Sequence, residues 1–179
     1  MLFDSAKGLK PLVIFLIYLA APASAETLGR MTAFLDGVPL DWHLITFVKG
    51  GEVTASASFR QTPYKAELIL HGHAKERFAS KGGLSVEARF GGVFEVGAEP
   101  IGLDILYLPE GLRGPIWTSN DATTAPRIEI IAFDVWGDVG HVEAVFQGEL
   151  CLRQFIYSPT DTSQCKSLSG QVTTDLAVE

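Results

Sequence analysis

A regular alternation of apolar and polar residues recurs along most of this chain. In 53–60, 84–90 and 142–150, every second residue is apolar and most of the residues between are polar. A period of two places one row of side chains in a core and the other in water, which is typical of half-buried antiparallel strands. Weaker forms of the pattern complete a set of predicted strands at 29–36, 38–47, 65–73, 101–108, 127–135 and 168–178.

Short, glycine-rich links join these segments, as at Asp36-Gly37, Lys49-Gly50-Gly51, Gly91-Gly92 and the stretch 136–140. Links this short require antiparallel neighbours, because a parallel crossover needs a dozen or more residues. We therefore predict an all-β domain, namely an antiparallel β-sandwich of about nine strands, with a small closed β-barrel as the alternative. Within 38–47 the apolar positions change parity after Leu44, which predicts a β-bulge there.

The first 25 residues predict a secretory signal peptide. Lys7 and Lys10 precede a ten-residue apolar run at 12–21, and Ala23-Ser24-Ala25 supplies a small-residue cleavage site. The run is too short for a membrane-spanning helix, which needs about 20 residues. We expect cleavage after Ala25, a single all-β domain over 26–179, and a periplasmic or secreted protein.

The predicted domain is acidic. The chain has 14 basic and 21 acidic residues, of which two lysines and one aspartate lie in the signal segment, so the remainder has a net charge of −8. Such a surface repels phosphate backbones, so we expect no nucleic-acid partner. The acidity and the polar strand faces also lead us to expect a soluble domain with no stable membrane insertion.

Two cysteines, Cys151 and Cys165, make up the whole cysteine content of the chain. An even number in an exported protein predicts a disulfide, here closing a turn-rich loop. A closed loop of about 15 residues stabilises by about 3 kcal/mol in the chain-entropy model.

The candidate metal ligands are His71 and His73, two residues apart on a predicted strand. Residues i and i+2 share a face, about 6.6 Å apart along the strand, and imidazoles suit transition metals. A third ligand would come from His43, His141 or a carboxylate such as Asp41. The alternative is a pair of solvated histidines on the outer face, opposite the core-facing leucines of that strand.

An acidic cluster surrounds the Trp136-Gly137 turn and offers two interpretations. Its members could hold calcium or form an acid and base pair, or they could be the solvated tip of a hairpin. They are Glu129, Asp134, Asp138 and Glu143.

The longest segment without strand periodicity is 109–126, and it contains Arg113 and Trp117. Long loops are uncommon unless they are functional or disordered, and Arg and Trp are enriched at binding hot spots. We predict a loop whose Ile116 and Trp117 fold back and cap the core, with a binding loop that uses Arg113 and Trp117 as the alternative.

No catalytic motif is present: the sequence lacks a G-x-S-x-G elbow, a phosphate-binding loop and an H-E-x-x-H pair. We therefore expect no cofactor and an exported, non-catalytic module that binds a protein, a glycan or a small ligand. The alternatives are a metal-dependent or hydrolytic enzyme outside the cytoplasm, and a small barrel that holds an apolar ligand.

Overall fold

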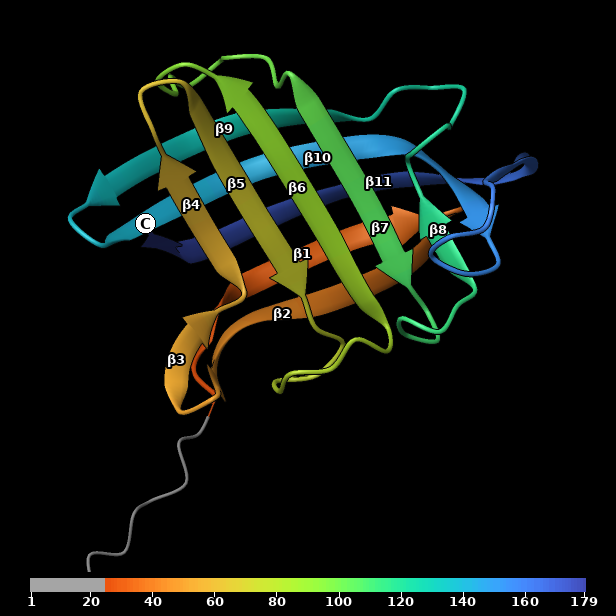
Figure 1. Cartoon of the computed structure of the whole chain (residues 1–179), viewed down its shortest axis with the longest axis horizontal. Coiled ribbons are helices and arrows are strands. Elements are labelled where there is room, and N and C mark those ends of the chain that lie inside the picture. Colours follow the sequence, from red (N-terminus) through yellow and green to blue (C-terminus); the bar gives the residue numbers. More distant parts are fainter. Residues whose placement is uncertain (1–24) are drawn as a thin grey trace, which may run out of the picture.

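The computed structural model describes residues 25–179, so the predicted signal peptide falls almost entirely outside the described residues. Eleven strands account for most of the described chain, and Figure 1 shows their arrangement. They are β1 (Thr27–Leu35), β2 (Val38–Lys49), β3 (Glu52–Ala55), β4 (Ala57–Gln61), β5 (Lys65–Gly72), β6 (Gly83–Gly91), β7 (Gly102–Leu108), β8 (Ile116–Thr118), β9 (Arg127–Trp136), β10 (Val139–Arg153) and β11 (Asp161–Val178).

The strands form one mixed, mostly antiparallel sheet in the order β3-β2-β1-β11-β4-β5-β6-β7-β8-β10-β9. Strand β10 also pairs with β11, so hydrogen bonding closes part of the sheet into a ring. Strand β4 joins the ring through a short parallel pairing with β11. The all-β prediction is thus confirmed, with eleven strands in place of about nine.

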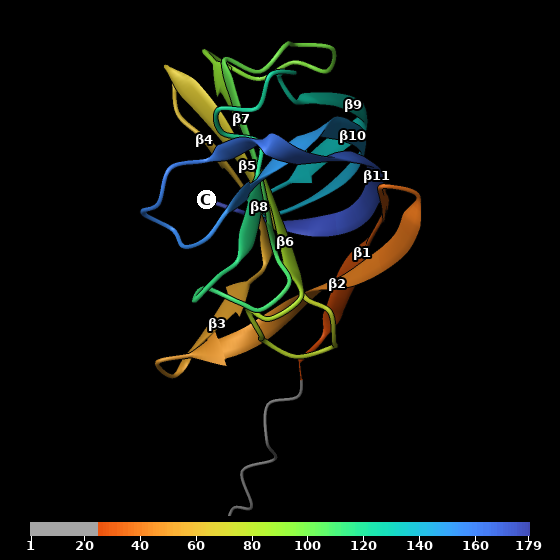
Figure 2. The same ribbon diagram turned by 90° about the vertical axis from the view of Figure 1, so that its right-hand side faces the viewer.

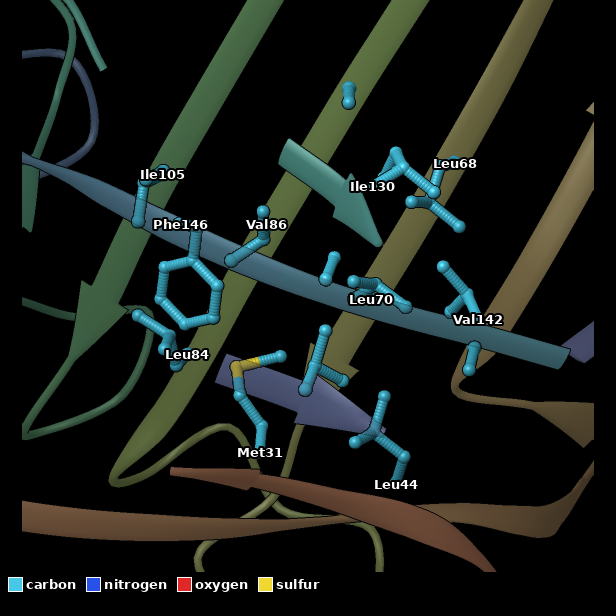
Figure 3. Close-up of a cluster of buried hydrophobic side chains, with 14 of the residues drawn as sticks. Met31, Leu44, Leu68, Leu70, Leu84, Val86, Ile105, Ile130, Val142 and Phe146 are labelled. Atoms are coloured by element: carbon cyan, nitrogen blue, oxygen red, sulfur yellow. The ribbon is translucent and has the colours of Figure 1, made fainter. Parts of the chain in front are cut away.

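Strands β4 to β7 lie across β9, β10, β11, β1 and β2, and the second view shows the same crossing from the side (Figures 1 and 2). Core side chains from both groups of strands meet in the space between them, with Met31 and Phe146 on one side and Leu70 and Val86 on the other (Figure 3). Burial of this cluster is the main source of the domain's stability.

Two differences from the predicted set account for the two additional strands. The predicted strand at 53–60 is broken at Ser56, whose backbone N–H donates to the carbonyl of Ile45 and whose Oγ accepts from the Ile45 N–H, both at 2.8 Å. The Ser56 carbonyl accepts from His71 N–H at 2.7 Å, so this residue ties β2 to β5. Strand β8 lies inside the segment expected to lack strands, because Ile116 and Thr118 are buried between β7 and β10.

A β-bulge does lie opposite Leu44, but its extra residue is on the partner strand and not within 38–47. The pairing of β1 with β2 shifts between Gly29, opposite Leu44, and Thr27, opposite Ile45, which leaves Leu28 as the extra residue. Leu44 and Ile45 are both fully buried although they are adjacent on β2. Within residues 25–179, no helix has the length and apolar character needed to cross a membrane.

Candidate functional site

Cys151 and Cys165 face each other across β10 and β11 and form the predicted disulfide, with their Cα atoms 3.9 Å apart. The bond closes the base of the loop between the two strands. Such bonds are typical of proteins in oxidising compartments. Within residues 25–179, the one group of three potential metal ligands within 4.8 Å of one another is Glu149 with these two cysteines, whose sulfurs are already bonded together.

Beyond the disulfide, the loop displays a run of apolar side chains. Phe155 is 62% exposed, Tyr157 is 97% exposed, and Ile156 between them is exposed as well. Leu112 is exposed on the β7–β8 connection. The same connection lies against the run at Gly114, where an added Cβ would clash with the backbone of Gln154 and Phe155. We call Leu112, Phe155, Ile156 and Tyr157 the apolar tip.

A tight turn fixes the conformation of the apolar tip. Ser158 N–H and Ser158 Oγ donate to the Phe155 carbonyl at 2.9 and 2.8 Å, and Phe155 N–H lies 3.0 Å from the same hydroxyl oxygen. Ile156 and Tyr157 occupy the two central positions of this turn, where their side chains point away from the local backbone contacts. The apolar residues are therefore held outward by the polar groups of the turn.

Arg153 braces the base of the same loop. Its Nη2 and Nε atoms donate to Thr160 Oγ1 at 2.7 and 3.2 Å, and Nη1 reaches the Ile156 carbonyl at 3.4 Å. The Thr160 hydroxyl in turn donates to Asp121 Oδ2 at 3.1 Å. These contacts join the two ends of the loop to each other and to the segment after β8.

The structure separates the two residues predicted for a binding loop. Arg113 is exposed next to Leu112, at the apolar tip. Trp117 lies on β8, packed against the core, with Lys166 Nζ 4.4 Å from its ring centroid. Arg113 is thus open to solvent, whereas Trp117 packs against the core, as the alternative of a core-capping loop predicted. The apolar tip itself was missed, although an apolar run Phe155-Ile156-Tyr157 between two bonded cysteines was a visible signal.

The two predicted metal ligands also lie in different environments. His71 is exposed, and its Nε2 lies 3.1 Å from Glu87 Oε1 on β6. His73 is only 5% exposed, so the expectation of two solvated histidines holds for His71 alone. The cause is a long-range contact: His73 forms an antiparallel bridge with His43 on β2, through backbone hydrogen bonds of 2.8 and 2.9 Å.

Around this bridge, two phenylalanines and one glutamate complete a small cluster that we call the histidine corner. The rings of Phe47 and Phe78 lie 6.2 and 5.4 Å from the His73 ring, measured between centroids. Glu76 Oε1 is 3.6 Å from His43 Nδ1, beyond hydrogen-bonding distance. The histidine corner lies next to the contact between Trp42 and Gly72. This contact is close, because a Cβ added at Gly72 would be 2.7 Å from the Cβ of Trp42.

Burial lowers the pKa of His73 below the ordinary histidine value, and the nearby His71 adds to this effect, while a hydrogen bond to the Ala79 backbone acts in the opposite direction. His73 Nδ1 lies 2.9 Å from the Ala79 carbonyl and 3.4 Å from the Ala79 N–H. The carbonyl contact is shorter and a carbonyl can only accept, so Nδ1 carries the proton. The lone pair of the neutral ring is therefore on Nε2.

Two members of the predicted acidic cluster, Asp134 and Glu143, lie beside a histidine. Asp134 on β9 and Asp175 on β11 are the cross-strand neighbours of His141 on β10, and His141 Nδ1 is 2.8 Å from Asp175 Oδ1. Glu143 lies 3.8 Å from the other ring nitrogen, whereas Asp138 lies in the hairpin turn and Glu129 farther along β9. These side chains are partly exposed, and contacts between such groups at a surface contribute little to stability.

Comparisons of the chain with protein-family models, curated proteins and solved structures find no match.

Proposed function

We propose that this chain is an exported, non-catalytic β-domain that binds a partner protein through the apolar tip. The observation that carries the proposal is the exposure of Phe155, Ile156 and Tyr157 on a turn that is anchored on both sides. Isolated exposed apolar residues need no explanation, but a contiguous group of them marks an interaction surface.

The free-energy gain from covering the apolar tip is large enough to support specific binding. Full burial of one side chain of this size contributes about 1.5–3 kcal/mol. Aromatic residues and arginine dominate the energetics of protein interfaces, and Arg113 stands beside Leu112 at the edge of the tip. A few such residues suffice for a specific contact.

The anchoring of the tip favours recognition without a large ordering cost. The disulfide, the Arg153 contacts and the Ser158 turn hold the loop in one conformation before any partner arrives. Loops that are already ordered lose less conformational entropy on binding. The partly closed sheet then acts as a rigid scaffold that presents the tip.

The chemistry of the tip favours a protein over the other partner classes. Leu112, Phe155 and Ile156 have no side-chain hydrogen-bonding group, whereas sugars require several polar groups for recognition. Core side chains fill the space between the two groups of strands, and this favours a surface partner over an enclosed small ligand. The signal segment and the disulfide support a periplasmic or secreted location.

Site-specific photo-crosslinking tests this proposal. A photoreactive phenylalanine analogue replaces Tyr157 in one variant and Tyr64 in another, and each is expressed in the cell envelope of the producing organism. Tyr64 is the matched control, since it is 87% exposed on the β4–β5 turn. We expect a discrete crosslinked product of a second protein from position 157 that is absent from position 64.

Two results would overturn the proposal. One is the same set of products from both positions, because that would mean non-specific contact. The other is the absence of any product from position 157. A crosslinked product with the mass of two copies of this chain would mean that the apolar tip mediates self-association and does not bind a different protein.

A further inference from the structure

Within residues 25–179, the buried side-chain nitrogen and oxygen atoms that lack a hydrogen-bond partner are two imidazole nitrogens, His43 Nδ1 and His73 Nε2. A buried polar atom without a hydrogen-bond partner destabilises the folded protein, so each one calls for an explanation. These two atoms belong to residues that face each other across a single β-bridge. One bound species could therefore satisfy both.

We propose that the histidine corner binds one divalent transition-metal ion of the zinc class, through His43 Nδ1 and His73 Nε2 with Glu76 as the third ligand. This inference is independent of the apolar tip and of any partner protein.

The backbone geometry brings the two imidazoles together. His43 and His73 exchange both backbone hydrogen bonds, so they are directly opposite each other and their side chains leave the sheet on the same side. The Cβ atoms of such a pair lie about 4.5–5.5 Å apart, a spacing from which two imidazoles can reach one ion. His71, which is paired with Glu87, is not part of this arrangement.

The ring of His73 is already oriented by a hydrogen bond from the nitrogen that would not bind the metal. Histidines that bind metals almost always donate the other ring N–H to a carbonyl or a carboxylate, which orients the ring and fixes the tautomer. His73 Nδ1 makes this contact with the Ala79 carbonyl at 2.9 Å, which directs the lone pair of Nε2 into the corner.

The surroundings supply a third ligand and two aromatic side chains beside the imidazoles. Glu76 Oε1 is 3.6 Å from His43 Nδ1 and extends from an exposed position, so a small movement of its side chain would bring it to an ion. Phe47 and Phe78 stack against each other beside His73, with 4.8 Å between their centroids. Apolar side chains beside a metal site strengthen the attraction between a cation and its ligands, while the 61% exposed Phe78 leaves the corner open to solvent on one side.

The three ligand atoms do not yet stand within 4.8 Å of one another, so binding requires side-chain adjustment. Glu76 and Phe78 belong to the segment between β5 and β6. Ion binding would therefore draw this segment towards β2. Two histidines and a carboxylate, with water as a fourth ligand, form a common tetrahedral zinc environment.

The test is a titration of the protein, prepared without a polyhistidine tag, with Zn²⁺. Calorimetry measures the affinity, and the nitrogen chemical shifts of the imidazoles identify the ligands in the unaltered chain. We expect saturable binding of one ion, with coordination shifts at His43 Nδ1 and His73 Nε2. His43→Gln and His73→Gln should each raise the Kd by about tenfold or more, and Glu76→Gln by a smaller factor.

His71→Gln is the matched control, since His71 lies two residues before His73 but outside the corner, and the Kd of this variant should equal that of the unaltered chain. The proposal is overturned by the absence of saturable binding or by coordination shifts at His71 or His141 in place of the two predicted nitrogens. The chemical shifts decide the question even where a substitution prevents folding.

Discussion

Arg153 donates two hydrogen bonds to the hydroxyl of Thr160, at 2.7 and 3.2 Å, across the base of the β10–β11 loop. Most of the Arg153 side chain is buried, so these contacts are shielded from water. The same hydroxyl donates to Asp121, which links the loop to the segment that follows β8. The exposed apolar tip therefore rests on a polar, hydrogen-bonded base.

Replacing Arg153 should loosen this base. We predict that Arg153→Ala lowers the free energy of unfolding by about 1–3 kcal/mol, because its hydrogen bonds to Thr160 are lost together with the contact of its Nη2 with Asp121 Oδ2 at 3.5 Å. Urea denaturation measures the change. Arg113→Ala is the control, since Arg113 is exposed at the tip, and it should change stability by less than about 0.5 kcal/mol. Equal losses for both variants would contradict the assigned role of Arg153.

Removing the disulfide should destabilise the domain further. The bond joins residues separated by 14 positions, and a loop of this size predicts a loss of about 3 kcal/mol for Cys151→Ala with Cys165→Ala. The contribution of the bond can also be measured without a substitution, by denaturing the unaltered protein in its oxidised and in its reduced form. If both forms unfold at the same denaturant concentration, the bond contributes no stability.

The order of the loop should depend on pH through Asp161. Hydrogen bonds from the side chain and backbone of Ser163, and one from Gln164, lower the pKa of Asp161 below its ordinary value. A lowered folded-state pKa means that the stabilising contribution is present above the unfolded-state value, about 3.9, and is lost as pH falls through the folded-state value.

A carboxyl titration by NMR tests this dependence on pH. We expect the Asp161 carboxyl to titrate below the ordinary range and the amide protection of Ser163 to decrease with it. Asp161→Asn should reduce that protection at neutral pH as well, since the amide nitrogen cannot accept from Gln164. A titration midpoint at or above the ordinary aspartate value would contradict this account.

Gly72 should tolerate no side chain. A Cβ at this buried position would be 2.7 Å from the Cβ of Trp42, so Gly72→Ala requires the two strands to separate. We expect a loss of about 1–3 kcal/mol, measured by thermal or urea unfolding. Gly91→Ala is the matched control, because the nearest atom there is 3.6 Å away. A stable Gly72→Ala variant would mean that β2 and β5 pack less closely at this corner than described.

Local sequence patterns predicted those parts of the fold that depend on local periodicity. The alternation at 84–90 and 142–150 gives β6 and most of β10, and Asp36-Gly37, both with positive φ, gives the tight turn between β1 and β2. The break at Ser56 was not predictable, since the alternation continues across it and its cause is a contact with Ile45, eleven residues away. The three-residue β8 is held by partners on β7 and β10 rather than by its own pattern.

The same limit applies to the candidate sites. The disulfide followed from two cysteines and an export signal, and its loop was recognised as rich in turns. The burial of His73 depends on β2 reaching β5, and no pattern within 65–73 distinguishes His73 from His71. The exposure of Phe155 and Tyr157 depends on the turn at Ser158, because apolar residues in a loop can equally fold back onto the core, as Ile116 does.

The most direct test of the account is the affinity of the chain for the protein that the crosslink at position 157 identifies. The double variant Phe155→Ser with Tyr157→Ser should raise the Kd about a hundredfold, because each side chain is expected to contribute about 1.4 kcal/mol to binding. Tyr64→Ser should leave the Kd unchanged. A Kd for the double variant within about twofold of the unaltered chain would contradict a binding role for the apolar tip.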